Sequence, residues 1–111
     1  MTLRTPEAEA RYRRFLKKDK LHRLEQLPSK KEFEYFKIVT AEFPHDKIAY
    51  LHDLLVPKRV VDHWTKLNAK EWQEFKEIDK YLSENYDCIK LNYPSYITIN
   101  YIVHWHLYGL K

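Results

Sequence analysis

Glycine and cysteine are almost absent from this sequence of 111 residues, and each shortage removes a class of function. A single glycine, Gly109, is too few for a P-loop or a dinucleotide-binding fingerprint, because both need several glycines where backbone amides approach phosphate. A single cysteine, Cys88, forms neither an internal disulfide nor a multi-cysteine zinc site, and we expect it to be buried in a strand. No serine nucleophile elbow is present either. Histidine is the residue type left to carry chemistry.

Long apolar runs are also missing, and the sequence starts with a charged segment rather than an apolar signal core, so we expect a cytoplasmic protein without membrane contact. The formal net charge is +4. Much of the excess lies in the first quarter of the chain, at Arg4, Arg11, Arg13, Arg14, Lys17, Lys18, Lys20 and Arg23. This basic segment is compatible with nucleic-acid binding, but its interspersed carboxylates favour a solvated helix face.

Periodicity and turn residues predict a helix, two strands, a connector, a long helix and two more strands. The expected ranges are 5–26, 33–39, 49–56, 58–67, 68–85, 87–93 and 97–108. The pattern Asn68-Ala69-Lys70-Glu71 is typical of a helix capping box. Strands in two pairs around one central helix favour an α+β fold with an antiparallel sheet. We therefore expect one domain over residues 29–111, preceded by a basic amphipathic helix within residues 1–28 that packs on it.

The last expected strand carries the most informative pattern, because its side chains alternate in character. One face is apolar, with Ile97, Ile99, Tyr101, Val103, Trp105 and Leu107. The other face combines Thr98, Asn100, His104 and His106 with Ile102 and Tyr108. Two imidazoles at i and i+2 on a buried strand are too polar to be incidental packing, so they predict a functional site.

Two chemistries fit such a histidine pair. A neutral imidazole attacks phosphorus at neutral pH without a metal, through a covalent intermediate. Alternatively, His104 and His106 are two ligands of a metal that needs a third, for which His52, His63 and Asp53 are candidates without a tight motif. We rank the metal site lower. His22, His45 and His63 are expected to be surface or turn histidines.

Three segments resemble the histidine-triad (HIT) superfamily of nucleotide hydrolases and transferases. They are Phe43-Pro44-His45-Asp46, then Leu51-His52-Asp53-Leu54-Leu55-Val56-Pro57-Lys58-Arg59, and then Thr98 to Leu107. The resemblance covers roughly residues 33 to 110, and the order and spacing of the segments are more specific than any one of them. It implies an antiparallel sheet with one long helix, a metal-independent reaction without a cofactor, and a homodimer.

The resemblance also implies roles for individual residues. The preferred alignment places the three triad positions at 102, 104 and 106, which makes His104 the nucleophile. Binding of the substrate phosphate then falls to His106, Thr98, His52, Asn92 and Lys90. A shifted alignment would make His104, His106 and Tyr108 the triad and His106 the nucleophile.

Two departures from the family pattern bear on activity. Ile102 stands where the first triad histidine is expected, and Tyr93-Pro94-Ser95-Tyr96 replaces the usual glycines of the loop before the last strand. Two functions remain open. The chain is a nucleotide hydrolase or nucleotidyl transferase acting on a phosphoanhydride, phosphoester or phosphoramidate, or it is a non-catalytic nucleotide-sensing or interaction module on a HIT scaffold.

Overall fold

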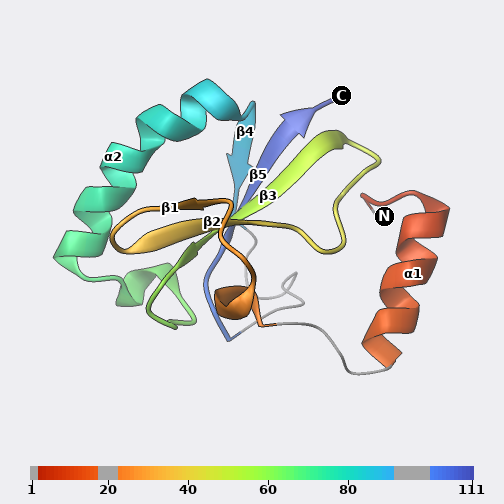
Figure 1. Cartoon of the computed structure of the whole chain (residues 1–111), viewed down its shortest axis with the longest axis horizontal. Helices are drawn as coiled ribbons and strands as arrows, with labels where there is room; N and C mark the ends of the chain where they lie inside the picture. Colours follow the sequence, from red (N-terminus) through yellow and green to blue (C-terminus); the bar gives the residue numbers. More distant parts are fainter. Residues whose placement is uncertain (1–2, 18–22, 92–100) are drawn as a thin grey trace.

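The computed structural model describes residues 3–17, 23–91 and 101–111. Two α-helices and five strands make up an α+β fold, with short 3₁₀ turns between them (Figure 1). Their bounds are α1 Pro6–Lys17, η1 Leu24–Gln26, β1 Lys31–Glu32, β2 Phe36–Thr40, β3 Ala49–Pro57, η2 Trp64–Lys66, α2 Ala69–Asn85, β4 Cys88–Lys90 and β5 Trp105–Leu110. The long helix has the bounds expected from its capping box, in which Asn68 Oδ1 accepts the Glu71 backbone N–H at 2.9 Å.

The five strands form one antiparallel sheet in the order β1-β2-β3-β5-β4. Strands β2 and β3 pair as an antiparallel hairpin. The C-terminal strand β5 lies in the sheet between β3 and β4, which places His52 opposite Tyr108 and Lys90 opposite His106. Residues that are far apart in the sequence therefore become neighbours on one sheet face.

Each face of the sheet has its own apolar cluster. Helix α2 covers one face, where Ile78 and Leu82 pack with Phe36, Ile38, Leu55, Trp105 and Leu107. On the opposite face lies a second cluster of Leu24, Val39, Ala41, Leu54, Val56 and Ile102. Because side chains alternate along a strand, His52 shares this second face with Leu54 and Val56. The histidines thus lie beside an apolar core rather than on an open surface.

The first helix is shorter than the sequence predicts. Its described part is Pro6–Lys17, and residues 23–26 do not continue it, because Arg23 has an extended backbone that leads into the separate η1 turn. The Leu24 backbone N–H donates to the Tyr101 hydroxyl at 2.6 Å, so a tertiary contact replaces the helical hydrogen bond expected there. Leu24 consequently lies in the second apolar cluster and not on a stripe of α1.

Three strand predictions also need correction. The histidine strand β5 starts at Trp105, because the Val103 N–H donates at 2.7 Å to the Val61 carbonyl, outside the sheet. Strand β2 starts at Phe36, since the chain turns just before it and the backbone amides of Glu34 and Tyr35 bond the Glu74 carboxylate. Cys88 is exposed rather than buried, because β4 forms an edge of the sheet.

Among the helices of the described residues, none is long and apolar enough to cross a membrane.

Candidate functional site

Three imidazoles meet at the end of the second sheet face. His52 comes from β3, His106 from β5 and His45 from the loop that joins β2 to β3. The His45 ring centroid lies 4.5 Å from that of His52 and 5.3 Å from that of His106. His104, just before β5, lies next to the cluster, with its ring centroid 5.3 Å from that of His106. His52, His104 and His106 are all buried.

Burial keeps these imidazoles neutral. Desolvation is the main cause that lowers the pKa of His45 to about 4, of His52 to about 3 and of His106 to about 2, and it also lowers the pKa of His104. Positive neighbours act in the same direction: Arg4 on His45 and His52, and Lys90 on all three members of the cluster. At neutral pH each ring therefore carries one proton, and its hydrogen bonds decide which nitrogen holds it.

A backbone amide fixes the proton on His52. The His45 N–H donates to His52 Nδ1 at 2.9 Å, and since an amide N–H only donates, Nδ1 must be the unprotonated nitrogen. The proton of His52 is then on Nε2, which lies 2.8 Å from His106 Nδ1. His52 donates this bond, and His106 accepts it. The proton of His106 is consequently on Nε2.

His104 has the opposite arrangement. Its Nδ1 lies 3.0 Å from the Ile102 carbonyl oxygen, which only accepts, so Nδ1 is protonated and Nε2 carries the lone pair. Two adjacent rings thus have complementary chemistry at Nε2: His104 has a nucleophilic nitrogen, and His106 has an N–H donor. Such a pair is suited to attack an electrophile whose oxygens need hydrogen bonds.

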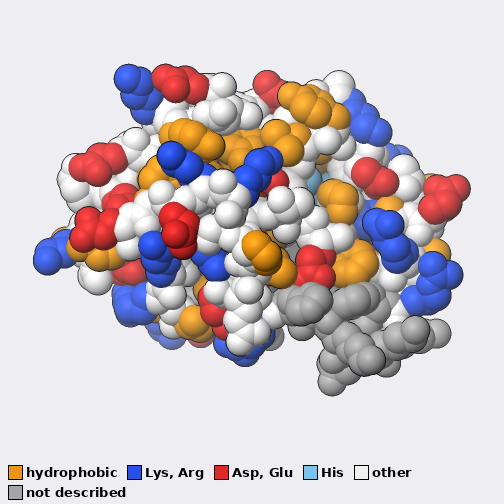
Figure 2. Space-filling view, viewed as in Figure 1, with side chains coloured by type: hydrophobic (Ala, Val, Ile, Leu, Met, Phe, Trp, Pro, Cys, Tyr) orange, Lys and Arg blue, Asp and Glu red, His pale blue; other side chains and the backbone are white. Residues whose placement is uncertain are grey.

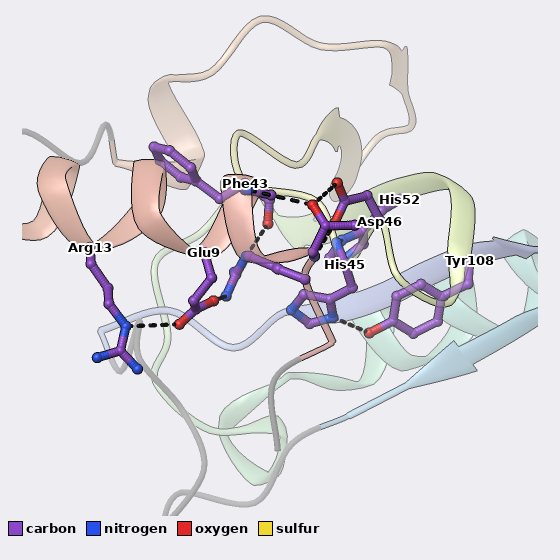
Figure 3. A network of polar contacts seen from close by, with 10 residues as sticks. Glu9, Arg13, Phe43, His45, Asp46, His52 and Tyr108 are labelled. Carbon is purple, nitrogen blue, oxygen red and sulfur yellow. Dashed lines mark hydrogen bonds and ion pairs between the residues drawn. The ribbon is translucent and has the colours of Figure 1, made fainter.

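The ring of His45 is held by Tyr108. His45 Nδ1 and the Tyr108 hydroxyl are hydrogen-bonded at 2.8 Å (Figure 3). The rings of His106 and Tyr108 stack with an interplanar angle of 10°. Burial raises the pKa of Tyr108 to about 12, so its hydroxyl stays protonated at neutral pH. Tyr108 therefore supports the cluster as a polar neighbour that carries no charge.

A metal ion fits these hydrogen bonds poorly. Ligand atoms of His45, His52 and His106 lie within 4.8 Å of one another, and neutral imidazoles are good ligands for zinc. However, His52 uses its lone pair on the His45 amide and its proton on His106, so a metal would have to break one of these bonds. Of the third ligands considered from the sequence, only His52 lies in the cluster, since His63 Nδ1 caps η2 and Asp53 bonds Lys30 and Tyr86.

The structure brings together part of the site expected from the sequence. His52, His104 and His106 lie close together, and Lys90 is the register partner of His106 on the edge strand β4. Thr98 and Asn92 lie outside the described residues. Ile102 lies on the sheet face that carries the histidines, but it is buried there within the second apolar cluster.

Sequence reasoning missed two residues of the site, His45 and Tyr108. His45 is in a turn, as expected, but its backbone and ring both contact the cluster. The sequence signal that could have indicated a site role for His45 is its position in the segment Phe43-Pro44-His45-Asp46, which resembles the family. Tyr108 follows His106 by two residues, so alternation along the strand already placed it on the histidine face.

Comparisons with known proteins support the fold and go no further. No protein-family model matches this sequence, and no curated protein matches it. A solved structure does: a HIT family hydrolase from Clostridium thermocellum, with a TM-score of 0.56 and 20% sequence identity, covering 88% of this chain and 87% of that chain. Similarity over nearly the whole length of both chains, together with the antiparallel sheet and long helix described above, shows that this α+β chain has the HIT-like fold.

Proposed function

We propose that this chain is a nucleotide hydrolase or nucleotidyl transferase that uses His104 as its nucleophile. In the first step, His104 Nε2 attacks phosphorus, and the leaving group departs with the electrons of its bond to phosphorus. In the second step, water or another acceptor attacks the phosphorus–nitrogen intermediate and releases the nucleotide. The substrate class is a nucleoside phosphoanhydride, phosphoester or phosphoramidate.

The placement of the ring protons is the observation that carries this proposal. His104 Nδ1 donates to a carbonyl, which leaves the lone pair of His104 Nε2 for attack on phosphorus. The neighbouring His106 carries its own ring proton on Nε2. A donor beside the nucleophile stabilises the charge that develops on the equatorial oxygens in the transition state. In the shifted alignment His106 would be the nucleophile, but its Nε2 is protonated and therefore unsuited to attack.

Two cations support an anionic substrate. Lys90 is exposed on β4 opposite His106, and Arg4 lies near enough to lower the pKa of His45 and His52. Charges of one sign beside a largely buried site attract the opposite sign. The face in Figure 2 carries acidic and basic side chains intermixed, with little histidine visible on it. We therefore place the phosphate at the histidines and not on the general surface.

A covalent adduct tests the proposal. Wild-type protein is mixed with a panel of nucleotides, and intact-mass spectrometry is used to detect an acid-labile nucleotidyl adduct and released mononucleotide. We expect the adduct on the peptide that contains His104. His104→Ala should lose turnover by several orders of magnitude while retaining much of its nucleotide affinity, and His63→Ala is the matched control outside the cluster. An adduct on His106 would instead support the shifted alignment.

The second candidate is a nucleotide-binding module without turnover. The burial of Ile102 in the apolar cluster favours it, because the triad lacks its first histidine at that position. The exposed arginines Arg11, Arg13 and Arg14 of α1 would then offer a docking surface for nucleic acid or a protein. Nucleotide binding with no adduct and no released product across the panel would favour this candidate.

A further inference from the structure

The N-terminal segment of the chain docks on the loop that carries His45. The Lys47 N–H donates to the Leu3 carbonyl at 2.9 Å, and Arg4 Nε donates to the Phe43 carbonyl at 2.9 Å. The ring of Tyr12 on α1 packs edge-on against Phe43, with the centroids 5.2 Å apart. Backbone and side-chain contacts thus hold residues 3–12 against the β2–β3 loop (Figure 3).

Asp46 is the centre of this docking. Its Oδ1 accepts the Thr5 backbone N–H at 2.8 Å, and its Oδ2 accepts the Thr5 hydroxyl at 3.0 Å. Thr5 immediately precedes α1, and its Oγ1 in turn accepts the Ala8 N–H at 3.4 Å. The backbone amide of Thr5 holds the pKa of Asp46 below its usual value, so the carboxylate is charged at neutral pH. A charged carboxylate at a helix N-terminus is a favourable contact.

The same loop also fixes the ring-proton position of His52 through the His45 backbone. His45 directly precedes Asp46, and its backbone N–H is the group that leaves Nε2 of His52 protonated. The His45 carbonyl accepts the N–H groups of Ile48 and Ala49, so the loop folds back tightly into β3. A displacement of the loop would therefore remove the bond that selects the tautomer of His52 and, through it, that of His106.

We propose that Thr5 and Asp46 are positioning residues, through which the N-terminal segment sets the ring-proton positions of His52 and His106. The role of these protons in phosphate binding rests on the proposed function, whereas their positions do not. Neither Thr5 nor Asp46 bonds an imidazole through its side chain in the described structure, so they act through the His45 backbone.

Nitrogen-15 NMR of the imidazoles in the full-length chain tests this proposal, because protonated and unprotonated ring nitrogens resonate at different frequencies. In the wild type, Nε2 of His52 and of His106 should be the protonated atoms. Asp46→Ala should give mixed tautomers for both rings. Asp46→Asn retains an oxygen acceptor for the Thr5 amide and should restore the wild-type spectrum. Asp62→Ala is the matched control, because Asp62 is an exposed loop carboxylate that pairs with Lys66.

Kinetics gives the second readout. If the chain turns over a nucleotide, Asp46→Ala should lower kcat about 10- to 100-fold with little change in KM, as expected when a catalytic geometry is loosened from a distance. Should Asp46→Ala fail to fold, Thr5→Val becomes the deciding variant: it removes the hydroxyl bonds to Asp46 and to the Ala8 N–H and leaves the backbone bond from Thr5 to Asp46. Mixed tautomers in the deciding variant support the proposal, and wild-type tautomers overturn it. Absence of turnover in the wild type would refute the proposed function and leave this NMR test intact.

Discussion

Ile102 occupies the position where the family pattern places a histidine, yet its environment is apolar. Its side chain is 1% exposed and packs with Leu54, Val56 and Val39. It lies before the start of β5, on the same sheet face as the histidines, but within the apolar cluster of that face. Restoring a histidine here is therefore a change to the core.

We expect Ile102→His to lower the free energy of unfolding by about 2–4 kcal/mol, because it buries an imidazole without a partner. Urea denaturation measures the effect. Ile102→Val, which only removes a methyl group, should cost about 0.5–1.5 kcal/mol, and the exposed change Val60→His should stay within about 0.5 kcal/mol. A fully stable Ile102→His variant with higher nucleotidase activity would contradict this view of position 102.

Stability should depend on pH through His52 and His106. Their pKa values are about 3 and 2 in the folded chain, whereas unfolded histidine titrates near pH 6.5, so the unfolded chain binds more protons below that pH. The free energy of unfolding should thus be highest above pH 6.5 and fall by about 1–3 kcal/mol per pH unit between pH 6 and 4.

Urea midpoints at pH 7.5, 6, 5 and 4.5 check this dependence. His52→Gln removes one of the histidines with a lowered pKa and should make the decline shallower, and His63→Gln is the control histidine outside the cluster. A midpoint that stays constant from pH 7.5 to 4.5 would show that the cluster does not disfavour protonation.

Among the elements, α2 depends most clearly on local sequence. Asn68 caps its first turn, and the Glu71 carboxylate accepts the Asn68 N–H at 2.8 Å. The same carboxylate accepts a hydrogen bond from Arg59 Nη2 at 2.6 Å. Glu71 is 2% exposed, so this cap also ties the connector before α2 to the helix. One short motif therefore sets the start of the helix that covers the main core.

Asn68→Ala should cost about 1 kcal/mol in the free energy of unfolding, because the Glu71 N–H loses its acceptor. Asn68→Asp keeps a carboxylate oxygen at the cap and should recover most of that loss. Thermal and urea unfolding of the two variants measure the difference. Equal stability of Asn68→Ala and the wild type would mean that tertiary packing alone fixes the start of α2.

For the whole molecule, the exposed edge of the sheet bears on assembly. All three residues of β4 are exposed, including Ile89 at 44%, and Trp64 on the connector is 40% exposed. An edge strand with an apolar side chain is a template for pairing with another chain. We therefore expect a symmetric homodimer, as the family resemblance implies.

Light scattering at micromolar concentration should give about twice the chain mass of 13.7 kDa. Ile89→Glu should shift the population toward the monomer, because it places a charge on the exposed edge. Glu84→Lys, a charge change on the exposed end of α2, is the control for net charge. A wild-type mass equal to that of one chain would refute the dimer.

The sequence alone determined the elements whose signals are local. The capping box and the helical spacing predicted α2 with its bounds, and strand β3 was predicted to within one residue because its β-branched and aromatic run ends at Pro57. The order and spacing of the histidine segments also indicated the HIT-like fold and three members of the site: His52, His104 and His106.

Tertiary structure decided what depends on contacts between distant residues. Leu24 bonds Tyr101, 77 residues away, instead of continuing a helix, and His45 enters the site through a hydrogen bond to Tyr108, 63 residues away. Ring tautomers depend on such contacts too, since the same imidazole donates or accepts according to the partner that folding supplies. The sequence therefore shows which histidines are present, and only the folded chain decides which of their nitrogens holds the proton.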